Sequence, residues 1–367
     1  MKRILIVCTT DSMIWNFLIP HIKELEKNGY YVECASSITG DFYEKLEKFY
    51  GIKMNEIPFK RSPYSFNNFI AYKKLCKLIR DKKIDIVFCH EPVGGALGRL
   101  AGHRCQCKVI YMAHGFHFFR GAEKSRIIYY WVEKILSYYT DILITINRED
   151  YNVALKFNEK KCYKVNGIGV DTSKFCKDEK YQLYLNNEFG LSNNAKKILS
   201  VGELIPRKNH EIIIKALAKL KRPDIYYFVA GDGQLKEKLK KLIVELKLEK
   251  NVFLLGYRSD IGQLCNSADI FAMPSVHEGL SVALMEAMGC EKAVVCSKIR
   301  GNVDLIEDGK GGFLCETYDV NGYVKAITNL ADSFEMRDSF GKYNAMIVKK
   351  FNIDIVKREI YNIINNC

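Results

Sequence analysis

Short runs of β-branched and aliphatic residues alternate with amphipathic segments along this chain, and this alternation most restricts its fold. Runs such as residues 3–10 and 84–90 are typical of strands, whereas residues 126–140 place apolar side chains at helical spacing. Strands that are linked through helices pair in parallel, and a parallel sheet needs helices on both faces. Because the pattern starts again near residue 196, we predict two doubly wound, Rossmann-like α/β domains.

The alternation also predicts where each domain lies. Strands are expected at residues 3–10, 30–36, 84–90, 108–115, 141–147 and 162–169, and then at residues 196–204, 225–233, 251–257, 269–275, 292–299 and 311–316. The first domain is expected over residues 1–169 and the second over 196–345, joined by a polar connector at 170–195. A C-terminal helix within 346–367 is expected to pack back toward the first domain. Ligands of doubly wound sheets lie at the carboxyl ends of strands, so we expect a site in a cleft between two facing domains.

Composition limits the class of protein. The 367 residues are 48% hydrophobic and 27% charged, which is typical of a folded globular chain. No apolar run is long enough to cross a membrane, and the short apolar run after Lys2 and Arg3 reads as a first strand rather than an export signal. The 13 cysteines are scattered without a CxxC pair, which favours reduced thiols in the cytoplasm and disfavours zinc.

Positive charge is concentrated in the first half. Residues 1–170 hold 27 Lys and Arg against 17 Asp and Glu, so they carry +10 of the net charge of +13. This asymmetry predicts that the first half meets an anionic surface or substrate. A nucleic-acid-binding protein is the non-enzymatic alternative, but the chain lacks Cys/His fingers, interleaved basic and aromatic RNA-binding motifs and a recognisable recognition helix. We therefore expect no nucleic-acid partner.

The usual nucleotide fingerprints are missing. The first strand is followed by TTDSMIW rather than by GxGxxG, and GxxxxGK[ST] occurs nowhere. Neither a nicotinamide dehydrogenase nor a P-loop ATPase is supported. Instead, Arg207 and Lys208 end the loop VGELIPRKNH just before a predicted helix. A helix N-terminus beside two cations can cradle a phosphate, although a solvated basic pair in a turn is an equally plausible alternative.

Two glutamates bracket a glycine and a short apolar run in residues 277–289, HEGLSVALMEAMG. Residues 269–275 form a predicted strand, so Glu278 is expected in the loop at the carboxyl end of this strand. A helix is expected to begin near Ser281. Glu286 then lies about one turn into this helix, which Gly289 is expected to stop. The amides of Gly279, Leu280 and Ser281 can hold a diphosphate, and a carboxylate can accept hydrogen bonds from a ribose diol. A helix cap and a salt bridge are the alternative explanation.

Glu278 and Glu286 resemble the E-x7-E signature of retaining glycosyltransferases of the GT-B fold, and most closely those of family 4. Residues 201–220, 230–239, 255–261, 268–275 and 299–314 are similar to that family's later loops and strands. In the first half, AHGFHFFRGA, TDILITINRED and VNGIGVDTSKF resemble the branch that serves capsule, exopolysaccharide and lipid-linked oligosaccharide assembly. Each motif alone is weak, but their order and spacing together are specific.

The resemblance implies a role for each matching residue. Lys208, helped by Arg207, would neutralise the leaving nucleoside diphosphate, while Glu278 and the amides of Gly279, Leu280 and Ser281 would border the donor sugar and its phosphates. Glu286 would bind the ribose hydroxyls, and His114 would lie near the sugar and the attacking hydroxyl. The backbone of Gly256 and Tyr257 would contact the base. One position departs from the pattern, since Glu203 stands where many members have Arg. His117 is equally well explained as a loop or core histidine.

The implied reaction is transfer of a hexose or N-acetylhexosamine, with retention, from a nucleotide sugar to a hydroxyl. The family is metal-independent and the nucleotide sugar is a substrate, so we expect no cofactor and no metal. UDP is the expected nucleotide, and a polyprenyl-diphosphate-linked saccharide is the expected acceptor in surface polysaccharide synthesis. The alternatives are a GT-B epimerase acting on a nucleotide sugar and a transferase with a soluble acceptor. The expected location is the cytoplasm, in association with the inner face of the plasma membrane.

Residues 60–83 suggest how the first half meets a membrane. They hold eight Lys and Arg and one Asp, while Phe69, Tyr72, Leu75, Cys76 and Ile79 recur at helical spacing. A helix with one apolar and one cationic face can lie in the interface of an anionic membrane. The alternative is a helix that packs its apolar face on the sheet and leaves its basic face in solvent.

Overall fold

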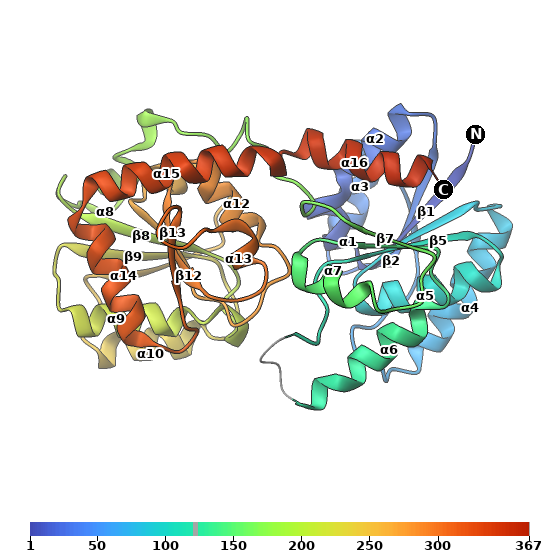
Figure 1. The fold of residues 1–367 in the computed structure, drawn as a ribbon, viewed down its shortest axis with the longest axis horizontal. Helices are drawn as coiled ribbons and strands as arrows, with labels where there is room; N and C mark the ends of the chain where they lie inside the picture. Colours follow the sequence, from blue (N-terminus) through green and yellow to red (C-terminus); the bar gives the residue numbers. More distant parts are fainter. Residues whose placement is uncertain (120–123, 367) are drawn as a thin grey trace. The chain divides into compact units, whose positions relative to one another are not determined.

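The computed structural model describes residues 1–119 and 124–366, and the chain divides into two compact units (Figure 1). Unit 1 combines residues 1–169 with the residues after 352, and unit 2 covers Val170–Asn352. The chain therefore passes from unit 1 to unit 2 and back again. Each unit is an α/β fold built on one parallel sheet, as the alternating pattern predicts.

Unit 1 contains a seven-stranded sheet in the order β3-β2-β1-β4-β5-β6-β7. Its strands are β1 (Arg3–Thr10), β2 (Tyr31–Ser37), β3 (Lys53–Glu56), β4 (Ile86–His90), β5 (Lys108–Ala113), β6 (Ile142–Thr145) and β7 (Lys161–Lys164). All of these neighbours pair in parallel. The sequence did not predict β3, because this edge strand, KMNE, buries only Met54 and so lacks an apolar run. The strand expected at 162–169 is shorter, since β7 ends at Lys164.

Helices cover both faces of the unit 1 sheet. Figure 1 shows α16 beside α2 on one face and α4, α5 and α6 on the other. The helical segments are α1 (Asp11–Met13), η1 (Ile14–Leu18), α2 (Ile19–Lys27), α3 (Phe42–Tyr50), α4 (Asn67–Asp81), α5 (Pro92–Arg104), η2 (Lys124–Arg126), α6 (Ile127–Ser137), α7 (Arg148–Ala154) and α16 (Ile353–Asn365). Glycines let α5 approach the sheet closely, since a Cβ at Gly98 would lie 2.6 Å from Cys89 Cβ.

The apolar stripe of α4 packs on the sheet. Leu75, Cys76 and Ile79 are buried in the unit 1 core, and Tyr72 packs against that core. Of the stripe, only Phe69 is largely exposed. The structure therefore favours the second interpretation of residues 60–83, in which the basic face of the helix lies in solvent and its apolar face supports the sheet.

Unit 2 contains a six-stranded sheet in the order β10-β9-β8-β11-β12-β13, again with every pair parallel. The strands are β8 (Lys196–Val201), β9 (Ile225–Ala230), β10 (Val252–Gly256), β11 (Ile270–Met273), β12 (Ala293–Ser297) and β13 (Gly312–Cys315), one for each strand expected in the second half. Branched side chains such as Ile198, Ile270 and Val295 fill the core between this sheet and its helices.

The helices of unit 2 lie on both faces of its sheet, with α9 and α14 on one face and α12 and α15 on the other (Figure 1). The helical segments are η3 (Glu179–Tyr181), α8 (Tyr184–Phe189), η4 (Pro206–Lys208), α9 (His210–Leu220), α10 (Lys236–Glu245), α11 (Ile261–Ser267), α12 (Val282–Gly289), α13 (Asn302–Leu305), α14 (Val320–Asp332), α15 (Phe334–Val348) and η5 (Lys349–Phe351).

The expected connector at 170–195 is a folded part of unit 2. Within it, the amide of Asp178 donates to Asn266 Oδ1 (2.9 Å) and the amide of Leu185 donates to Ser267 Oγ (2.9 Å). These bonds fix η3 and α8 to α11. Sequence polarity was misleading here because the segment is held by these bonds and by isolated buried side chains, such as Phe175 and Leu185, rather than by a continuous apolar run.

The second passage between the units lies later than the expected boundary at 346. Helix α15 continues to Val348 within unit 2, and unit 1 resumes at Ile353 with α16. Helix α16 packs on α2 and on the start of β2. Tyr30 donates to Asn365 Oδ1 (3.3 Å), and Lys357 Nζ lies 3.5 Å from Glu24 Oε2.

Both sheets reverse their strand order at one point. In unit 1 the reversal separates β1 from β4, and in unit 2 it separates β8 from β11. Loops leaving the carboxyl ends of such strands diverge and leave room for a ligand between them. In unit 2 these are the loops that carry Arg207, Lys208 and Glu278. In unit 1, Thr9 lies near the end of strand β1, just before such a loop, and Glu91 directly follows β4.

Candidate functional site

Two loops meet at the reversal point of the unit 2 sheet. The loop after β8 contains Arg207 and Lys208 in the short helix η4, and the loop after β11 contains His277 and Glu278. The amide of Val276 donates to the carbonyl oxygen of Arg207 (2.7 Å), and Arg207 Nη1 donates to the carbonyl oxygen of His277 (3.2 Å). The backbone of one loop is thus fixed to that of the other.

Glu278 joins both basic residues of this site. Its Oε1 lies 2.8 Å from Arg207 Nη1 and 2.8 Å from Lys208 Nζ. Burial alone would raise the pKa of Glu278, but the charges of Lys208 and Arg207 lower it to about 2. Glu278 is therefore ionised at neutral pH, and the three side chains carry a net charge of +1. The Lys208 side chain is only 12% exposed, so little water screens this charge.

Arg300, in the loop between β12 and α13, supports the loop that carries Glu278. Its Nε donates to the carbonyl oxygen of Glu278 (3.1 Å), and the side chain is buried. The next residue, Gly301, has a φ of 82°, and a Cβ there would lie 2.5 Å from the carbonyl oxygen of Gly279. Sequence reasoning did not select Arg300. The available signal was a basic residue followed by glycine directly after a predicted strand.

Helix α12 begins where the sequence predicts. Ser281 caps it by accepting a hydrogen bond from the Leu284 amide at its Oγ (3.3 Å), and Gly279, Leu280 and Ser281 lead into its first turn. The helix ends at Gly289, but not through a left-handed glycine. A Cβ at Gly289 would lie 2.3 Å from the carbonyl oxygen of Phe175, so this glycine permits close packing.

Glu286 lies one turn along α12 and is half-buried. Burial raises its pKa to about 7, and the charge of Lys174 offsets only part of this effect. Within residues 1–119 and 124–366, the Glu286 carboxylate has neither a hydrogen bond nor an ion pair. A poorly solvated carboxylate without a protein partner is suited to bind hydroxyl groups of a ligand.

Gly256 and Tyr257 lie at the end of the edge strand β10. Gly256 has a φ of 70° and its carbonyl oxygen accepts a hydrogen bond from the Gly231 amide (2.8 Å), whereas the side chain of Tyr257 is 85% exposed. Glu203, at the position where many relatives have Arg, is also exposed.

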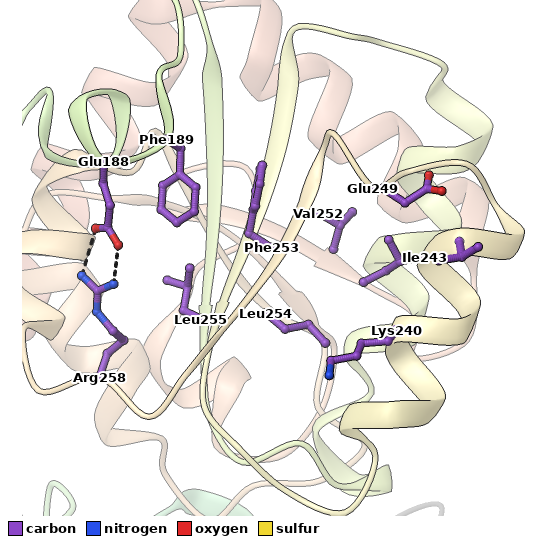
Figure 2. A pocket seen from close by; sticks show the side chains of 11 residues that line it. Glu188, Phe189, Lys240, Ile243, Glu249, Val252, Phe253, Leu254, Leu255 and Arg258 are labelled. Carbon is purple, nitrogen blue, oxygen red and sulfur yellow. Dashed lines mark hydrogen bonds and ion pairs between the residues drawn. The ribbon is translucent and has the colours of Figure 1, made fainter.

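A separate pocket of about 510 Å³ lies beside β10 and is lined by residues of that strand, of α8 and of α10 (Figure 2). Figure 2 shows Phe189 and Phe253 facing each other in it, with the ion pair of Glu188 and Arg258 at one border. None of the site residues predicted from the sequence lines this pocket. It is therefore distinct from the two loops that hold Lys208 and Glu278.

At the reversal point of unit 1, Glu91 has an unusual backbone conformation. Its φ of 62° is rare for a residue with a side chain, and its Oε2 accepts hydrogen bonds from the amides of Thr9 (2.8 Å) and Thr10 (3.2 Å). Burial raises the pKa of Glu91, although these amides act in the opposite direction. Strain of this kind often marks functional positions. Sequence reasoning missed Glu91, although it directly follows a predicted strand.

His114 follows β5 in unit 1 and pairs with a second histidine. Its Nε2 lies 2.9 Å from Nδ1 of His90, which is fully buried at the end of β4. Burial, together with the nearby His21, lowers the pKa of His114 to about 4, so this side chain is neutral at pH 7. His117, by contrast, is exposed in the following loop. Residues 120–122, which end the motif AHGFHFFRGA, lie outside the described residues.

Unit 1 also contains a cavity of about 590 Å³ between the segment before α4 and helix α6. Its lining is largely apolar, and Thr9, Arg61 and Glu91 supply polar groups. The cavity therefore adjoins the reversal point of the unit 1 sheet. In the part of the chain that the structure describes, no three His, Cys, Asp or Glu side chains are grouped to hold a metal ion.

Two family models match the chain. The model of the glycosyl transferases group 1 covers residues 185–346, and that of the glycosyl transferase 4-like proteins covers residues 3–147. A putative glycosyltransferase, EpsD, of Bacillus subtilis is 34% identical over 360 residues, which are 96% of this chain and 93% of that protein. The Escherichia coli UDP-Gal:alpha-D-GlcNAc-diphosphoundecaprenol alpha-1,3-galactosyltransferase is 32% identical over 296 residues, covering 77% and 75% of the two chains.

Solved structures show the same architecture. The Anabaena protein HepE, determined in complex with UDP, superposes with a TM-score of 0.84 over 100% of both chains at 19% identity. Two parallel-sheet α/β units with this likeness define a glycosyltransferase of the GT-B fold. The chain belongs to the group 1, or family 4, glycosyltransferases. This finding confirms the family that residues 274–289 and the other motifs predicted. The capsular polysaccharide biosynthesis glycosyltransferase CapM of Staphylococcus aureus is also similar to this chain, at 24% identity over 322 residues, which are 84% of each chain.

Proposed function

We propose that this glycosyltransferase moves a hexose or N-acetylhexosamine from a UDP-sugar to a hydroxyl of a lipid-diphosphate-linked saccharide, with retention of the anomeric configuration. The donor class is supported by the name of the Escherichia coli relative and by the UDP bound to HepE. The same relative's name specifies a diphosphoundecaprenol acceptor. The location that we propose is the inner face of the plasma membrane. No described helix is both long and apolar enough to cross a bilayer.

The observation that carries the proposal is the convergence of Arg207 and Lys208 on one oxygen of Glu278 near the start of α12. Departure of the nucleoside diphosphate places negative charge on phosphate oxygens. Fixed cations and backbone amides of Gly279, Leu280 and Ser281 would stabilise that charge without reorganising in the transition state. Electrostatic stabilisation of this kind is the largest contribution that the site offers.

These cations would also neutralise the charge of the leaving diphosphate, which a divalent metal ion neutralises in other glycosyltransferases. The proposal therefore includes a metal-independent reaction with no cofactor. It predicts that a chelator such as EDTA leaves turnover unchanged, and loss of activity that added Mg²⁺ or Mn²⁺ restores would contradict it. A control with an enzyme known to need a metal establishes that the chelator works.

The other donor contacts follow from the positions of the side chains. Glu286 would accept hydrogen bonds from the two ribose hydroxyls, and the exposed backbone at Gly256 and Tyr257 would contact the base. Glu278 would border the donor sugar while holding Lys208 and Arg207 in place. His114 would contribute a neutral imidazole to the sugar and the acceptor hydroxyl.

Retention is proposed to occur without a covalent sugar–enzyme intermediate. A double displacement needs a carboxylate nucleophile beside a second acid, but the low pKa of Glu278 and its two cationic partners make it a weak nucleophile. In the proposed step, the bond from the anomeric carbon to the diphosphate oxygen breaks as the acceptor oxygen bonds on the same face. The departing phosphate oxygen takes the acceptor proton.

The test is a donor screen followed by a transfer assay. Thermal shifts with a panel of nucleotide sugars are expected to select a UDP-sugar, and the selected donor is then incubated with a polyprenyl-diphosphate-linked saccharide. Release of UDP with a new product that keeps the anomeric configuration of the selected donor would support the proposal. An epimerised nucleotide sugar formed without acceptor would favour the epimerase alternative, and transfer only to a free sugar would favour a soluble acceptor.

A further inference from the structure

Helix α6 presents an apolar surface that no other described part of unit 1 covers. Six large apolar and aromatic residues, five in the helix and one at its C-cap, are between 43% and 65% exposed and recur at spacings of one, three and four residues: Ile127, Ile128, Trp131, Val132, Ile135 and Tyr138. We call this set the α6 face. Contiguous exposed surfaces of this kind are rare on soluble monomers and mark interaction sites.

The opposite side of α6 fixes the helix firmly to unit 1. Glu133 accepts from the buried Arg99 (2.8 Å), Leu136 is buried, and the ring of Tyr130 lies 5.4 Å from that of Phe118. The apolar character of the α6 face is therefore not needed to hold the helix in place. A helix that is apolar on both its packed and its open side is expected where a second apolar medium meets it.

A second group of exposed aromatic residues lies beside the same cavity. Tyr64 and Phe66, just before α4, are 86% and 76% exposed, and Phe69 packs on Phe66 with ring centroids 5.9 Å apart. The cavity of unit 1 is lined on one side by Pro63 and Tyr64 and on the other by the α6 residues Ile128 and Val132. The two apolar groups thus border a common opening between α4 and α6.

Cations that form no ion pair lie beside the second of these apolar groups, in the segment before α4 and on α4 itself. Within residues 1–119 and 124–366, none of Lys60, Arg61, Lys73, Lys74 and Lys77 forms an ion pair, and all five are exposed. Arg61 also lines the cavity. An apolar face flanked by cations matches the surface of a bilayer that contains anionic lipids. A second copy of this chain would bring the same cations together and meet electrostatic repulsion.

We propose that the α6 face, with Tyr64 and Phe66, seats unit 1 on the surface of an anionic bilayer. The aromatic and branched side chains would enter the headgroup region, where Trp and Tyr are favoured, and the neighbouring cations would bind lipid phosphates. This inference replaces α4 with α6 as the membrane helix. It rests on the proposed function in one respect, since an isoprenoid-linked acceptor requires the enzyme to work at the membrane.

The cavity explains why this surface would serve the reaction. Its apolar wall belongs to α6, and its polar groups, Thr9, Arg61 and Glu91, lie toward the reversal point of the sheet. A lipid-linked headgroup that leaves the bilayer beside α6 would thus meet a cation first and the polar end of the cavity next. The seating of α6 would shorten the path of the acceptor out of the membrane.

Trp131 allows the contact to be observed directly. The chain has two tryptophans, Trp15 and Trp131. In the full-length Trp15→Phe protein, emission from Trp131 is expected to shift to shorter wavelength when vesicles of phosphatidylcholine and phosphatidylglycerol are added. Brominated lipids are expected to quench it. Unchanged emission with both kinds of vesicle, while wild-type protein floats with them, would overturn the assignment of α6.

A flotation assay tests the energetic contribution of the face. The triple variant Ile127→Ser, Trp131→Ser, Ile135→Ser is expected to bind the anionic vesicles at least about tenfold more weakly than wild type. The matched control, Phe49→Ser, Phe334→Ser, Ile355→Ser, removes three exposed apolar side chains elsewhere and is expected to bind as wild type. Pure phosphatidylcholine or high salt is expected to weaken wild-type binding. Equal binding by both triple variants would overturn the proposal, as would a changed oligomeric state of the α6 variant with unchanged vesicle binding.

An activity comparison separates this inference from the proposed function. The α6 variant is expected to lose transfer to a full-length polyprenyl acceptor in vesicles and to keep transfer to a short-chain, water-soluble acceptor with the same diphosphate saccharide. Equal loss on both acceptors would contradict a role at the membrane. If wild type uses neither acceptor, the proposed function fails, and the fluorescence and flotation results still decide whether α6 binds the bilayer.

Discussion

Arg207 and Lys208 contact the same oxygen atom of Glu278, each at 2.8 Å. The cations that we assign to the leaving diphosphate are therefore held by a carboxylate of the protein itself. One negative charge balances one of the two positive charges, and the remaining charge is available to a ligand. This arrangement fixes the two basic side chains in advance, so that binding the diphosphate costs little side-chain entropy.

Replacing Lys208 by Ala is expected to lower turnover by about two to three orders of magnitude, because a fixed cation at the leaving group is lost. The fold should persist, since Arg207 still pairs with Glu278. Steady-state kinetics and a thermal melt check both expectations. Lys215→Ala, which removes an exposed lysine of α9 paired with Glu211, is the control and should leave turnover unchanged. Wild-type turnover in the Lys208 variant would contradict the assignment.

Glu278→Gln is expected to separate nucleotide binding from turnover. The change removes the negative charge next to Lys208 and Arg207, so free UDP should bind about threefold more tightly or better. Turnover of the UDP-sugar should fall, because the two cations lose their fixed position. Calorimetry with UDP and a transfer assay measure the two effects. Weaker UDP binding in this variant would show that Glu278 itself contacts the nucleotide.

Glu286 is expected to make stability depend on pH. Its pKa is raised from 4.5 to about 7, so ionisation opposes folding: the cost is absent below pH 4.5, grows between pH 4.5 and 7, and is complete above pH 7. Glu286→Gln should therefore stabilise the protein at pH 8 by on the order of 1–2 kcal/mol and have little effect at pH 4.5. Urea unfolding at the two pH values measures this difference.

The same residue gives a signature of donor binding. If the ionised form of Glu286 accepts the ribose hydroxyls, UDP binding at pH 7 should release protons from this carboxyl group. Calorimetry in buffers of different ionisation enthalpy counts those protons, and Glu286→Gln corrects for the titration of UDP itself. Equal proton release and equal affinity in both proteins would remove Glu286 from the donor site.

His90 is expected to act through His114. The 2.9 Å contact between them couples the tautomers of the two rings, since one nitrogen must donate and the other accept, and His90 has no access to solvent. His90→Leu should lower kcat about tenfold or more and leave UDP affinity unchanged. His90→Asn should restore part of kcat, because its side chain places a polar atom near the position of Nδ1. Equal kcat in the Leu and Asn variants would contradict a positioning role.

His21 offers a test of acid sensitivity. It is buried with its Nε2 2.8 Å from the carbonyl oxygen of Ile168, and burial lowers its pKa from 6.5 to about 4. Between pH 6.5 and 4 the unfolded chain therefore binds a proton at His21 that the folded chain does not bind. The free energy of unfolding falls as the pH drops through this range. His21→Gln should reduce this fall by on the order of 1–3 kcal/mol. His103→Gln, at an exposed histidine, is the control.

Tryptophan fluorescence follows this transition in unit 1, because Trp15 and Trp131 both belong to that unit. Three glutamates of unit 1, Glu91, Glu159 and Glu359, have pKa values that burial raises, and they act in the opposite direction. For this reason the comparison of variants, rather than the wild-type profile, measures the contribution of His21. An unchanged pH profile in His21→Gln would contradict the prediction.

Strong local patterns explain how far the sequence predicted the fold. The central strands β11 and β12 of unit 2 are buried on both faces, so they are apolar runs such as Ile270–Met273. Edge strand β3 lacks such a run and was missed. The segment 170–195 was interpreted as a connector because backbone hydrogen bonds, which leave no trace in residue type, attach it to unit 2.

The candidate site was likewise predicted only in part. Glu278, Lys208 and Arg207 could be found because their motifs are local and similar to those of a known family. Arg300, Glu91 and His90 could not, because their roles depend on tertiary contacts between neighbouring strand ends. The sequences of α4 and α6 both show apolar residues at helical spacing. Only the structure shows that most of those in α4 are buried in the core, whereas most of those in α6 are exposed.

The placement of α16 in unit 1 affects the order in which the domains can form during synthesis. Unit 2 is continuous in sequence, so it can fold as soon as its own residues leave the ribosome. The surface of α2 and the start of β2, by contrast, must wait for a helix that is translated only after all of unit 2. Nascent unit 1 would meanwhile expose the apolar surface that α16 covers, and exposed surface of this kind favours aggregation until the helix is translated.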